Sequence, residues 1–373
     1  MTPNYSPEKK QIIQDYAKYF TPMRMRTMQH MGLDIVETQR EGATVTDIDG
    51  EVYYDCLAVG GIFNLGRRHP RIVKAIKDAL EYSDLGNNFL VSKPRLDLAK
   101  KLAQTTPGDV NCSFFGVSGS ESNDLAIKLA RGYTSRSEII SAHNCYHGCT
   151  GFSVSTSDAE EFKVFGPKLP GFKQVLFGNI DDFVQNVTKN TAAVIFEPMI
   201  IEAGFARPPK GFFQQAREHC NKVGALMIID EVVTGMGRTG TFWGIEREEI
   251  VPDIMVSAKG LSAGMYPISV MIFREELSDF FISNPFCHYS SFGGPELGCI
   301  VALEAINIIN TPEFLNEVNR KGELFKNGFA KLKEKYSSIV DSYDQQGLMG
   351  AMRFKNEDSG MRLMHFLAKN KVF

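Results

Sequence analysis

The chain has 373 residues, of which 43% are hydrophobic and 23% charged, and 41 Lys and Arg against 44 Asp and Glu give a formal net charge of −3. This composition is that of an ordinary soluble globular protein. The near-neutral charge argues against a nucleic-acid partner, which would need a basic surface. Apolar runs such as AAVIF and ALMII fall far short of the roughly 18 residues that span a bilayer, so we expect no membrane partner either.

The seven cysteines are scattered along the chain and odd in number. A disulfide framework is not expected from such a set in a long chain, which favours a reducing compartment. The N-terminal sequence MTPNYSPEKKQIIQDY also lacks the continuous apolar stretch of a signal peptide. Together these features predict a cytoplasmic protein.

The first predicted element is a helix over 7–20, with Ser6 as its N-cap and proline at the first helical position. Short extended pieces follow, and Asp49-Gly50 within TVTDIDGEVYYDC is typical of a hairpin turn. Two further helical patterns lie at 71–82 and 92–104.

From residue 113 onward, short β-rich runs alternate with helical stretches. The β-rich runs are SFFGV, EIISA, AAVIF, ALMIID, IMVSA and ISVMIF, and the helical stretches include SESNDLAIKLARGY and GFFQQAREHCNKVG. Several runs are continuously apolar, which is typical of strands buried on both faces of a mainly parallel sheet covered by helices. Beyond Pro295 the pattern changes to two long helices and an extended piece, GLMGAMRF. We therefore predict an α/β fold with a large domain near 56–300 and a smaller α+β domain formed by 1–55 and 301–373.

The segment VSGSES at 117–122 follows the strand SFFGV and directly precedes a helical pattern. Small residues at such a turn let the backbone approach an anion, and the helix N-terminus offers free N–H groups and the positive end of the helix dipole. Ser118 and Ser120 could add hydroxyl donors, so the segment fits a phosphate-binding loop. The alternative is an ordinary capped helix, with one of these serines at the N-cap and Glu121 in the first turn.

The segment GMGRTG at 235–240 has the glycine pattern of a dinucleotide-binding loop. Its context argues against that interpretation, because the pattern does not directly follow the strand ALMIID and no clean helical periodicity comes after it. A nicotinamide-dependent oxidoreductase is therefore the less favoured hypothesis.

His143, Cys145, His147 and Cys149 stand at every second position of HNCYHGC. These are zinc-type ligands, but an extended strand would place them in a row on one face, whereas a tetrahedral site needs ligands that converge from two segments. We expect chance spacing and a separate use of His147 rather than a metal site.

Asp230 ends the strand ALMIID, and Lys259 follows the strand IMVSA. Ligands of open α/β sheets gather outside the carboxyl ends of the strands, so an acid and an amine at two such ends are well placed to act together. The small and apolar neighbours of Lys259 disfavour its charged form and make the amine a better nucleophile. The alternative is a structural salt bridge or an unrelated surface pair.

Taken together, eight segments in one order resemble the class III aminotransferases, which are pyridoxal-phosphate enzymes of the aspartate-aminotransferase fold type I. The segments are DIDGEVYYD, LGRRHPRIVKAI, FFGVSGSESNDLAIKLAR, YHGCTG, EPMIIEAG, IIDEVVTGMGRTG, PDIMVSAKGLSAGMYPIS and SSFGGPELGC. The resemblance covers about 49–350 and implies a seven-stranded type of sheet in the large domain, with pyridoxal 5'-phosphate as the cofactor. It also places GMGRTG in a loop rather than in a dinucleotide site.

The resemblance implies specific roles for the two strand-end residues and the phosphate loop. Lys259 would hold pyridoxal 5'-phosphate as a Schiff base and move the proton between substrate and cofactor. Asp230 would pair with the pyridine nitrogen and keep it protonated, so that the ring accepts electrons. Ser118, Gly119 and Ser120 would hold the phosphate at the helix N-terminus, in agreement with the analysis of the loop itself.

Five further positions take roles from the resemblance. Tyr146 would stack on one face of the cofactor ring and Val232 would pack on the other, with His147 as a supporting residue. Glu197, at the end of AAVIFE, would face the substrate. Ser291 stands where the family usually has a threonine whose hydroxyl reaches the phosphate of the neighbouring subunit, which implies a homodimer with a shared active site.

The implied reaction moves an amino group from an amine or amino acid to a 2-oxo acid or aldehyde. The ω-amine type is favoured, because Cys149 stands where acetylornithine and ornithine members commonly have an arginine that grips a carboxylate. The alternatives are a decarboxylase, racemase or aminomutase on the same scaffold, or a catalytically silent homologue that serves as a structural or binding subunit.

Two further features depart from the family pattern. Arg67 and Arg68 fall within GRRHP, where the family usually has G-H-x-H-P, and we expect a solvated turn there rather than a cation at the site entrance. The sequence also ends at Phe373, before the further small-domain helix and strand that family members have. Either the sequence is incomplete or the small domain is natively short, and a short domain would put closure over the substrate in doubt.

Overall fold

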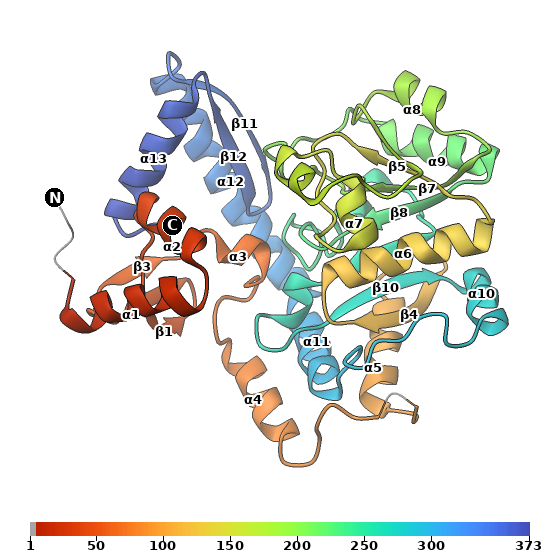
Figure 1. Ribbon diagram of the computed structural model, residues 1–373, viewed down its shortest axis with the longest axis horizontal. Helices are drawn as coiled ribbons and strands as arrows, with labels where there is room; N and C mark the ends of the chain where they lie inside the picture. Colours follow the sequence, from red (N-terminus) through yellow and green to blue (C-terminus); the bar gives the residue numbers. More distant parts are fainter. Residues whose placement is uncertain (1–4, 88) are drawn as a thin grey trace.

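The computed structural model describes residues 5–87 and 89–373. Its centre is a seven-stranded sheet with the order β4-β10-β9-β8-β7-β5-β6 (Figure 1). Strand β10 runs antiparallel to its two neighbours, and the other pairs are parallel. The strands are β4 (Val110–Gly116), β5 (Glu138–Ala142), β6 (Phe172–Val175), β7 (Thr191–Phe196), β8 (Leu226–Asp230), β9 (Ile254–Ser257) and β10 (Ser269–Arg274). The predicted α/β fold with a mainly parallel sheet is confirmed.

Both faces of this sheet are buried, as the continuous apolar runs predict. All six side chains of β7 are buried, and they alternate between two cores. Val194 and Phe196 join a core with α4, α5, α9 and α11, whereas Ala193 and Ile195 join a core with α6. This alternation follows from the two-residue period of a strand, and each buried aliphatic side chain contributes about 1.5–3 kcal/mol.

Helices cover the sheet on both sides, and α6 lies across one face (Figure 1). The helices between β3 and α12 are α3 (Ala58–Gly61), α4 (Pro70–Ala79), α5 (Lys93–Ala103), α6 (Gly119–Thr134), α7 (Gly151–Thr156), α8 (Ile180–Asn186), α9 (Phe212–Val223), α10 (Ser278–Ser283) and α11 (Glu296–Ile309), and α3 lies apart from the large sheet, beside the chain ends (Figure 1). Four short 3₁₀ helices connect them: η1 (Glu160–Phe165), η2 (Gly244–Glu248), η3 (Lys259–Ser262) and η4 (Glu275–Leu277).

The two chain ends come together beside the large sheet (Figure 1). They contribute α1 (Pro7–Tyr19), α2 (Pro22–His30), α12 (Pro312–Lys335), α13 (Glu357–Lys369), a sheet of β1 (Glu37–Glu41), β2 (Thr44–Asp47) and β3 (Val52–Tyr54), and a hairpin of β11 (Val340–Gln346) and β12 (Met349–Phe354). The Tyr54 N–H donates to the Lys371 carbonyl at 2.7 Å, and the Phe373 N–H donates to the Tyr54 carbonyl at 3.0 Å. We propose the two domains that the sequence predicts, with α11 crossing the boundary at 300 and packing on the large one.

The local signals at the N-terminus are confirmed. Helix α1 begins at Pro7, and the Ser6 side chain accepts a hydrogen bond from the Lys9 N–H at 3.1 Å. Gly50 has φ = 83°, as a tight turn between β2 and β3 requires. Strands β1, β6 and β11 were not predicted, because their sequences ETQRE, FKQV and VDSYDQQ are largely polar.

The expectation of a solvated turn is wrong for Arg67, although Arg68 is exposed. Arg67 is only 5% exposed, and its Nε and Nη2 donate to Asp55 Oδ2 at 2.9 and 2.7 Å. Its guanidinium also lies 4.2 Å from the centre of the Phe63 ring. A planar guanidinium paired with a buried carboxylate and stacked on an aromatic ring is stable away from water, which sequence spacing does not reveal.

No single helix among residues 5–87 and 89–373 is long and apolar enough to cross a membrane. Helices α11 and α12 pass that test only as a pair, and the chain bends by 68° between them.

Candidate active site

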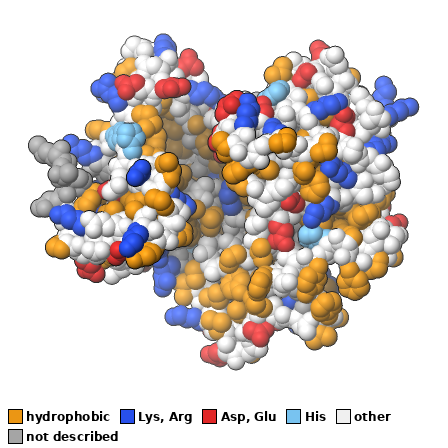
Figure 2. Space-filling model, viewed as in Figure 1, with side chains coloured by type: hydrophobic (Ala, Val, Ile, Leu, Met, Phe, Trp, Pro, Cys, Tyr) orange, Lys and Arg blue, Asp and Glu red, His pale blue; other side chains and the backbone are white. Residues whose placement is uncertain are grey.

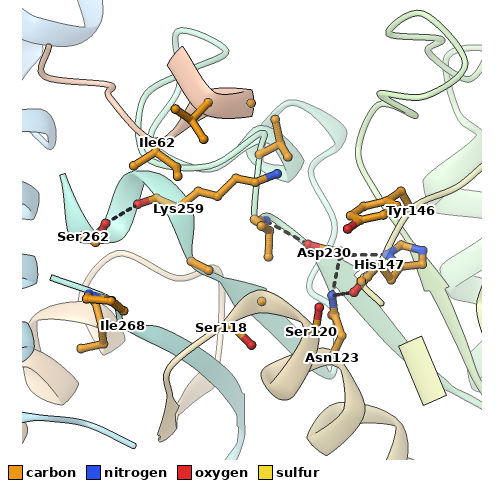
Figure 3. A pocket seen from close by; sticks show the side chains of 18 of the residues that line it. Ile62, Ser118, Ser120, Asn123, Tyr146, His147, Asp230, Lys259, Ser262 and Ile268 are labelled. Carbon is orange, nitrogen blue, oxygen red and sulfur yellow. Dashed lines mark hydrogen bonds and ion pairs between the residues drawn. The ribbon is translucent and has the colours of Figure 1, made fainter. Parts of the chain in front are cut away.

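A cavity of about 620 Å³ opens at the carboxyl ends of the central strands. Lys259, which follows β9, extends across it toward the side of Asp230 and Tyr146 (Figure 3). Asp230 ends β8, and Glu197 follows β7. The predicted gathering of strand-end residues at one edge of the sheet is therefore what the fold produces.

The loop before α6 forms one wall of the cavity. Ser118 is the N-cap of α6, and its Oγ accepts from the Glu121 N–H at 3.2 Å, which leaves the hydroxyl hydrogen available to another acceptor. The first N–H groups of a helix have no acceptor within the helix itself. A Cβ at Gly119 would lie 3.0 Å from Val232 Cγ2, so a side chain there would crowd Val232. The helix-cap interpretation of VSGSES is confirmed, and the same loop lines the cavity, where a phosphate-binding loop would also lie.

Asp230 is 4% exposed and accepts from three donors. Asn123 Nδ2 lies 2.7 Å and His147 Nδ1 2.8 Å from Asp230 Oδ2, while the Val232 N–H donates to Oδ1 at 2.9 Å. Asn123 Nδ2 also donates to the His147 carbonyl at 2.8 Å. Three convergent donors hold the carboxylate in one orientation.

His147 lies behind Asp230 and is 2% exposed (Figure 3). Burial opposes a charge on its imidazole, but the Cys145 sulfur and the Asp230 carboxylate outweigh that cost and hold the pKa of His147 well above its ordinary value. The separate use of His147 that the sequence favours is thus with Asp230. The other three members of HNCYHGC lie in a loop rather than a strand, and no cluster of metal-binding side chains occurs in the described part of the chain.

Lys259 has a left-handed backbone conformation with φ = 40°, which is strained for a residue that is not glycine. Ser262 Oγ donates to the Lys259 carbonyl at 2.9 Å and helps to hold this turn. Burial lowers the pKa of the Lys259 amine, and the carboxylates of Asp230, Glu197 and Glu202 oppose this shift only in part. A desolvated amine that loses its proton more easily is the better nucleophile and base.

Tyr146 and Glu197 adjoin each other in the wall of the cavity. The Tyr146 N–H donates to Glu197 Oε1 at 3.2 Å, and the Tyr146 hydroxyl lies 3.1 Å from Cys149 Sγ. Burial, assisted by Cys149, raises the pKa of the Tyr146 phenol to about 12. Burial also raises the pKa of Glu197 to about 7, so both its protonated and its ionised form are populated near neutral pH.

Comparison with known proteins agrees with this geometry. The family model described as aminotransferase class-III matches residues 25–371. The chain belongs to the class III aminotransferases. It is a pyridoxal-phosphate-dependent transaminase of fold type I, which confirms the family, the activity and the cofactor inferred from the sequence.

Three relatives illustrate the similarity. An uncharacterized aminotransferase of Archaeoglobus fulgidus is 45% identical over 352 residues, which are 94% of this chain and 83% of that protein. The ornithine aminotransferase from Toxoplasma gondii ME49 superposes with a TM-score of 0.89 at 26% identity, covering 99% of this chain and 88% of that one. The taurine:2-oxoglutarate aminotransferase from Bifidobacterium kashiwanohense, in complex with PLP and glutamate, gives 0.82 at 27% identity, covering 87% and 79%.

The chemical groups that line the cavity of this aminotransferase suit pyridoxal phosphate. Hydroxyl and helix N–H donors suit the phosphate, a buried carboxylate suits the protonated ring nitrogen, and a desolvated amine suits the aldehyde. The buried Nε2 of His147 and Oδ1 of Asn123 find no hydrogen-bond partner among the described residues. Two buried polar atoms without a partner beside Asp230 are consistent with a site that binds a further polar group.

Nine of the ten sequence-predicted site residues line this cavity, and Ser291 does not. The nine are Ser118, Gly119, Ser120, Tyr146, His147, Glu197, Asp230, Val232 and Lys259. Sequence reasoning missed Asn123 and Glu202, which also line it. Asn123 was detectable, since it stands four residues after Gly119 and therefore on the same face of α6.

Proposed function

We propose that this transaminase takes an amino group from an amine or amino acid, with ω-amines favoured, and passes it to a 2-oxo acid or aldehyde. The observation that carries the proposal is the desolvated amine of Lys259 facing the cavity that Asp230 and the Ser118–Ser120 loop also line. When bound, pyridoxal phosphate supplies the electron sink that stabilises negative charge on the substrate carbon.

Proton transfer and positioning of the cofactor are assigned to residues of the chain. Lys259 Nζ takes the proton from the substrate carbon that bears the amino group and later returns a proton to the acceptor. Asp230, fixed by its three donors, would hold the proton on the ring nitrogen. Ser118, Gly119 and Ser120 would hold the phosphate, and Tyr146 and Val232 would contact the ring.

The preference for ω-amines is supported by the lining of the cavity. Among the described residues no arginine lines it, and Lys259 is its one lysine, so a substrate carboxylate has no guanidinium partner there. Glu197 and Glu202 add acidic groups instead. The similarity to a taurine:2-oxoglutarate aminotransferase points to the same class of donor, an amine without an α-carboxylate, and to a 2-oxo acid acceptor.

The test is a donor panel with the purified protein and added cofactor. We expect a visible pyridoxal-type chromophore that borohydride reduces, and transfer from ω-amines to pyruvate or 2-oxoglutarate. Absence of the chromophore would refute the proposed roles of the cavity. Release of CO2 without amino transfer would assign the site to a decarboxylase instead.

We also propose a homodimer in which Ser291 contributes to the partner's phosphate site. Hydrophobic side chains gather in the region of α4 and α5 (Figure 2). Exposed hydrophobic residues come from two segments that meet through the stacked rings of Phe89 and Tyr289, with centres 5.6 Å apart. The exposed set is Tyr82, Leu85, Phe89, Leu90, Val91, Phe286, Tyr289 and Phe292. So large an apolar surface next to Ser291 is typical of a subunit interface. Light scattering should give twice the 41.6 kDa of one chain.

A cytoplasmic location is part of the same proposal. All seven cysteines are free thiols, and three of them, Cys56, Cys149 and Cys287, are exposed. Exposed thiols persist in a reducing compartment. Cell fractionation would test this, and recovery outside the cytoplasm would contradict it.

A further inference from the structure

The hairpin of β11 and β12 holds a loop of the large domain through one arginine. Arg353 on β12 donates from Nη2 to the carbonyls of Ala203 and Gly204, at 3.1 and 2.9 Å. These carbonyls lie 150 and 149 residues away in the sequence. We propose that Arg353 is a positioning residue, which fixes the loop Ile200–Ala206 at the substrate end of the cavity and thereby sets the affinity for the amino donor. This inference builds on the proposed function.

The loop is a compact turn that presents its carbonyl groups to Arg353. Ile200 and Ala206 exchange backbone hydrogen bonds of 2.9 and 3.1 Å, which close its base. Gly204 and Phe205 have φ = 70° and 61°, so the backbone reverses in the left-handed region. A Cβ at Gly204 would lie 3.2 Å from Arg353 Nε, which shows that the guanidinium packs directly on the glycine. Phe205 is strained in this conformation because it is not glycine, so a contact from outside the turn helps to hold it.

A second set of contacts fixes the guanidinium on the hairpin. Arg353 Nη1 lies 2.8 Å from Asp344 Oδ2 on β11, and Asp344 Oδ1 lies 3.6 Å from Arg207 Nη2, just beyond the loop. Arg207 Nη1 also donates to Gln346 Oε1 at 3.3 Å. The fork of the guanidinium can bond the carboxylate and the two carbonyls at once, which a lysine amine cannot do with the same geometry.

The loop in turn shapes the cavity. Ile201 and Glu202 line it, and the Ile201 N–H donates to Glu197 Oε2 at 3.4 Å. The Glu202 carboxylate is close enough to Lys259 and Tyr146 to act on the pKa of both. A loop that shifts when Arg353 is removed therefore moves an acidic side chain at the substrate end, while Asp230 and the helix loop keep their own contacts.

The test compares Arg353→Met with Arg362→Met in the full-length enzyme. Methionine keeps the aliphatic stem but removes the donors, and the Arg353 side chain is 35% exposed, so water can replace the lost bonds and the variant should fold. Arg362 is a matched control on α13, because it is 80% exposed and pairs only loosely with Asp358 at 3.8 Å. The readouts are hydrogen exchange of the loop amides without substrate, and the separate values of KM and kcat.

We expect Arg353→Met to speed exchange of the Gly204, Phe205 and Ala206 amides by about tenfold. The KM for the amino donor should rise roughly three- to tenfold with little change in kcat, and Arg353→Lys should recover part of the loss. Unchanged exchange rates of the loop amides overturn the proposal. A fall in kcat with KM unchanged also overturns it, because that result indicates a smaller fraction of folded enzyme. If the wild type transfers no amino group, the proposed function fails, while the exchange result still decides whether Arg353 holds the loop.

Discussion

The two ends of the cavity are built in different ways. At the proposed cofactor end, Asp230 is buried and receives three hydrogen bonds from α6, the loop before α7 and its own turn. At the proposed substrate end, Glu202 lies on a loop whose outer contacts come from Arg353 of the C-terminal hairpin, which is itself paired with Asp344. The donors to Asp230 thus all come from segments around the central sheet, whereas the loop of Glu202 depends on a hairpin near the C-terminal end of the chain.

This contrast matches the chemical demands on each end. Electron withdrawal by the cofactor requires a fixed carboxylate and a fixed amine, which preorganised and buried groups supply. Choice of the donor requires a surface that differs between relatives, and a loop held by side chains of another domain can change without disturbing the chemistry. Substitutions at the proposed cofactor end should therefore abolish the reaction. Substitutions toward the proposed substrate end should instead change the affinity for the donor or the dependence on pH.

The largest effect is expected for Lys259→Ala. Removal of the amine that moves the proton should lower amino transfer roughly 10⁴-fold. Borohydride should no longer attach pyridoxal to the chain, whereas the exposed Lys222→Ala variant should label like the wild type. Mass spectrometry of the reduced protein measures this, and continued labelling of Lys259→Ala would place the reactive amine elsewhere.

Asn123→Ala tests whether the donors around Asp230 hold the cofactor end together. Loss of a buried hydrogen bond to a charged group costs about 1.5–3 kcal/mol, so the dissociation constant for pyridoxal phosphate should rise about tenfold or more. Asn221→Ala, at an exposed position on α9, is the control. Titration of the apoenzyme with cofactor measures the change, and equal affinities would mean that His147 and Val232 suffice to hold Asp230.

Glu197 joins the two ends, since it accepts from the Tyr146 and Ile201 N–H groups. Its pKa of about 7 in the folded protein exceeds the ordinary 4.5, so its contribution to stability is complete below pH 4.5 and is lost as the pH rises toward 7. Glu231 has the same direction of shift and adds to this slope. The free energy of unfolding of the wild type should therefore fall over this range.

Glu197→Gln should reduce the fall in the free energy of unfolding between pH 4.5 and 7 by up to roughly 3 kcal/mol, because the amide does not ionise. Glu218→Gln at an exposed position should leave the slope unchanged. Urea unfolding at several pH values gives the result. Parallel pH curves for the wild type and Glu197→Gln would show that this carboxyl titrates normally.

The smallest effect is expected for Ser291→Ala. If its hydroxyl reaches the phosphate of the partner subunit, the substitution removes one hydrogen bond to the cofactor. The cofactor should then leave the dimer about three- to tenfold faster during dialysis. Ser338→Ala, at an exposed position beyond α12, should behave like the wild type. Equal rates for both would remove Ser291 from the proposed shared site.

The sequence by itself determined the α/β class, the loop at 117–122 and the pair of Asp230 and Lys259, and its resemblance to the class III aminotransferases added the family and the other predicted residues that line the cavity. The first set could be inferred because its signals are local: continuous apolar runs mark strands buried on both faces, and residues just after a parallel strand lie at the ligand-binding edge. Ser118 and Gly119 are recognisable for the same reason, since a strand followed by small residues and a helix has one geometry.

Only the tertiary structure decided which side chains meet. Asn123 contacts Asp230 across 107 residues, Arg353 contacts Ala203 across 150, and Arg67 is buried by its pair with Asp55. Such contacts leave no periodic pattern in the sequence, because each depends on two elements that the packing of the whole chain brings together. The chemistry of the site could therefore be inferred from short motifs, but the control of its substrate end could not.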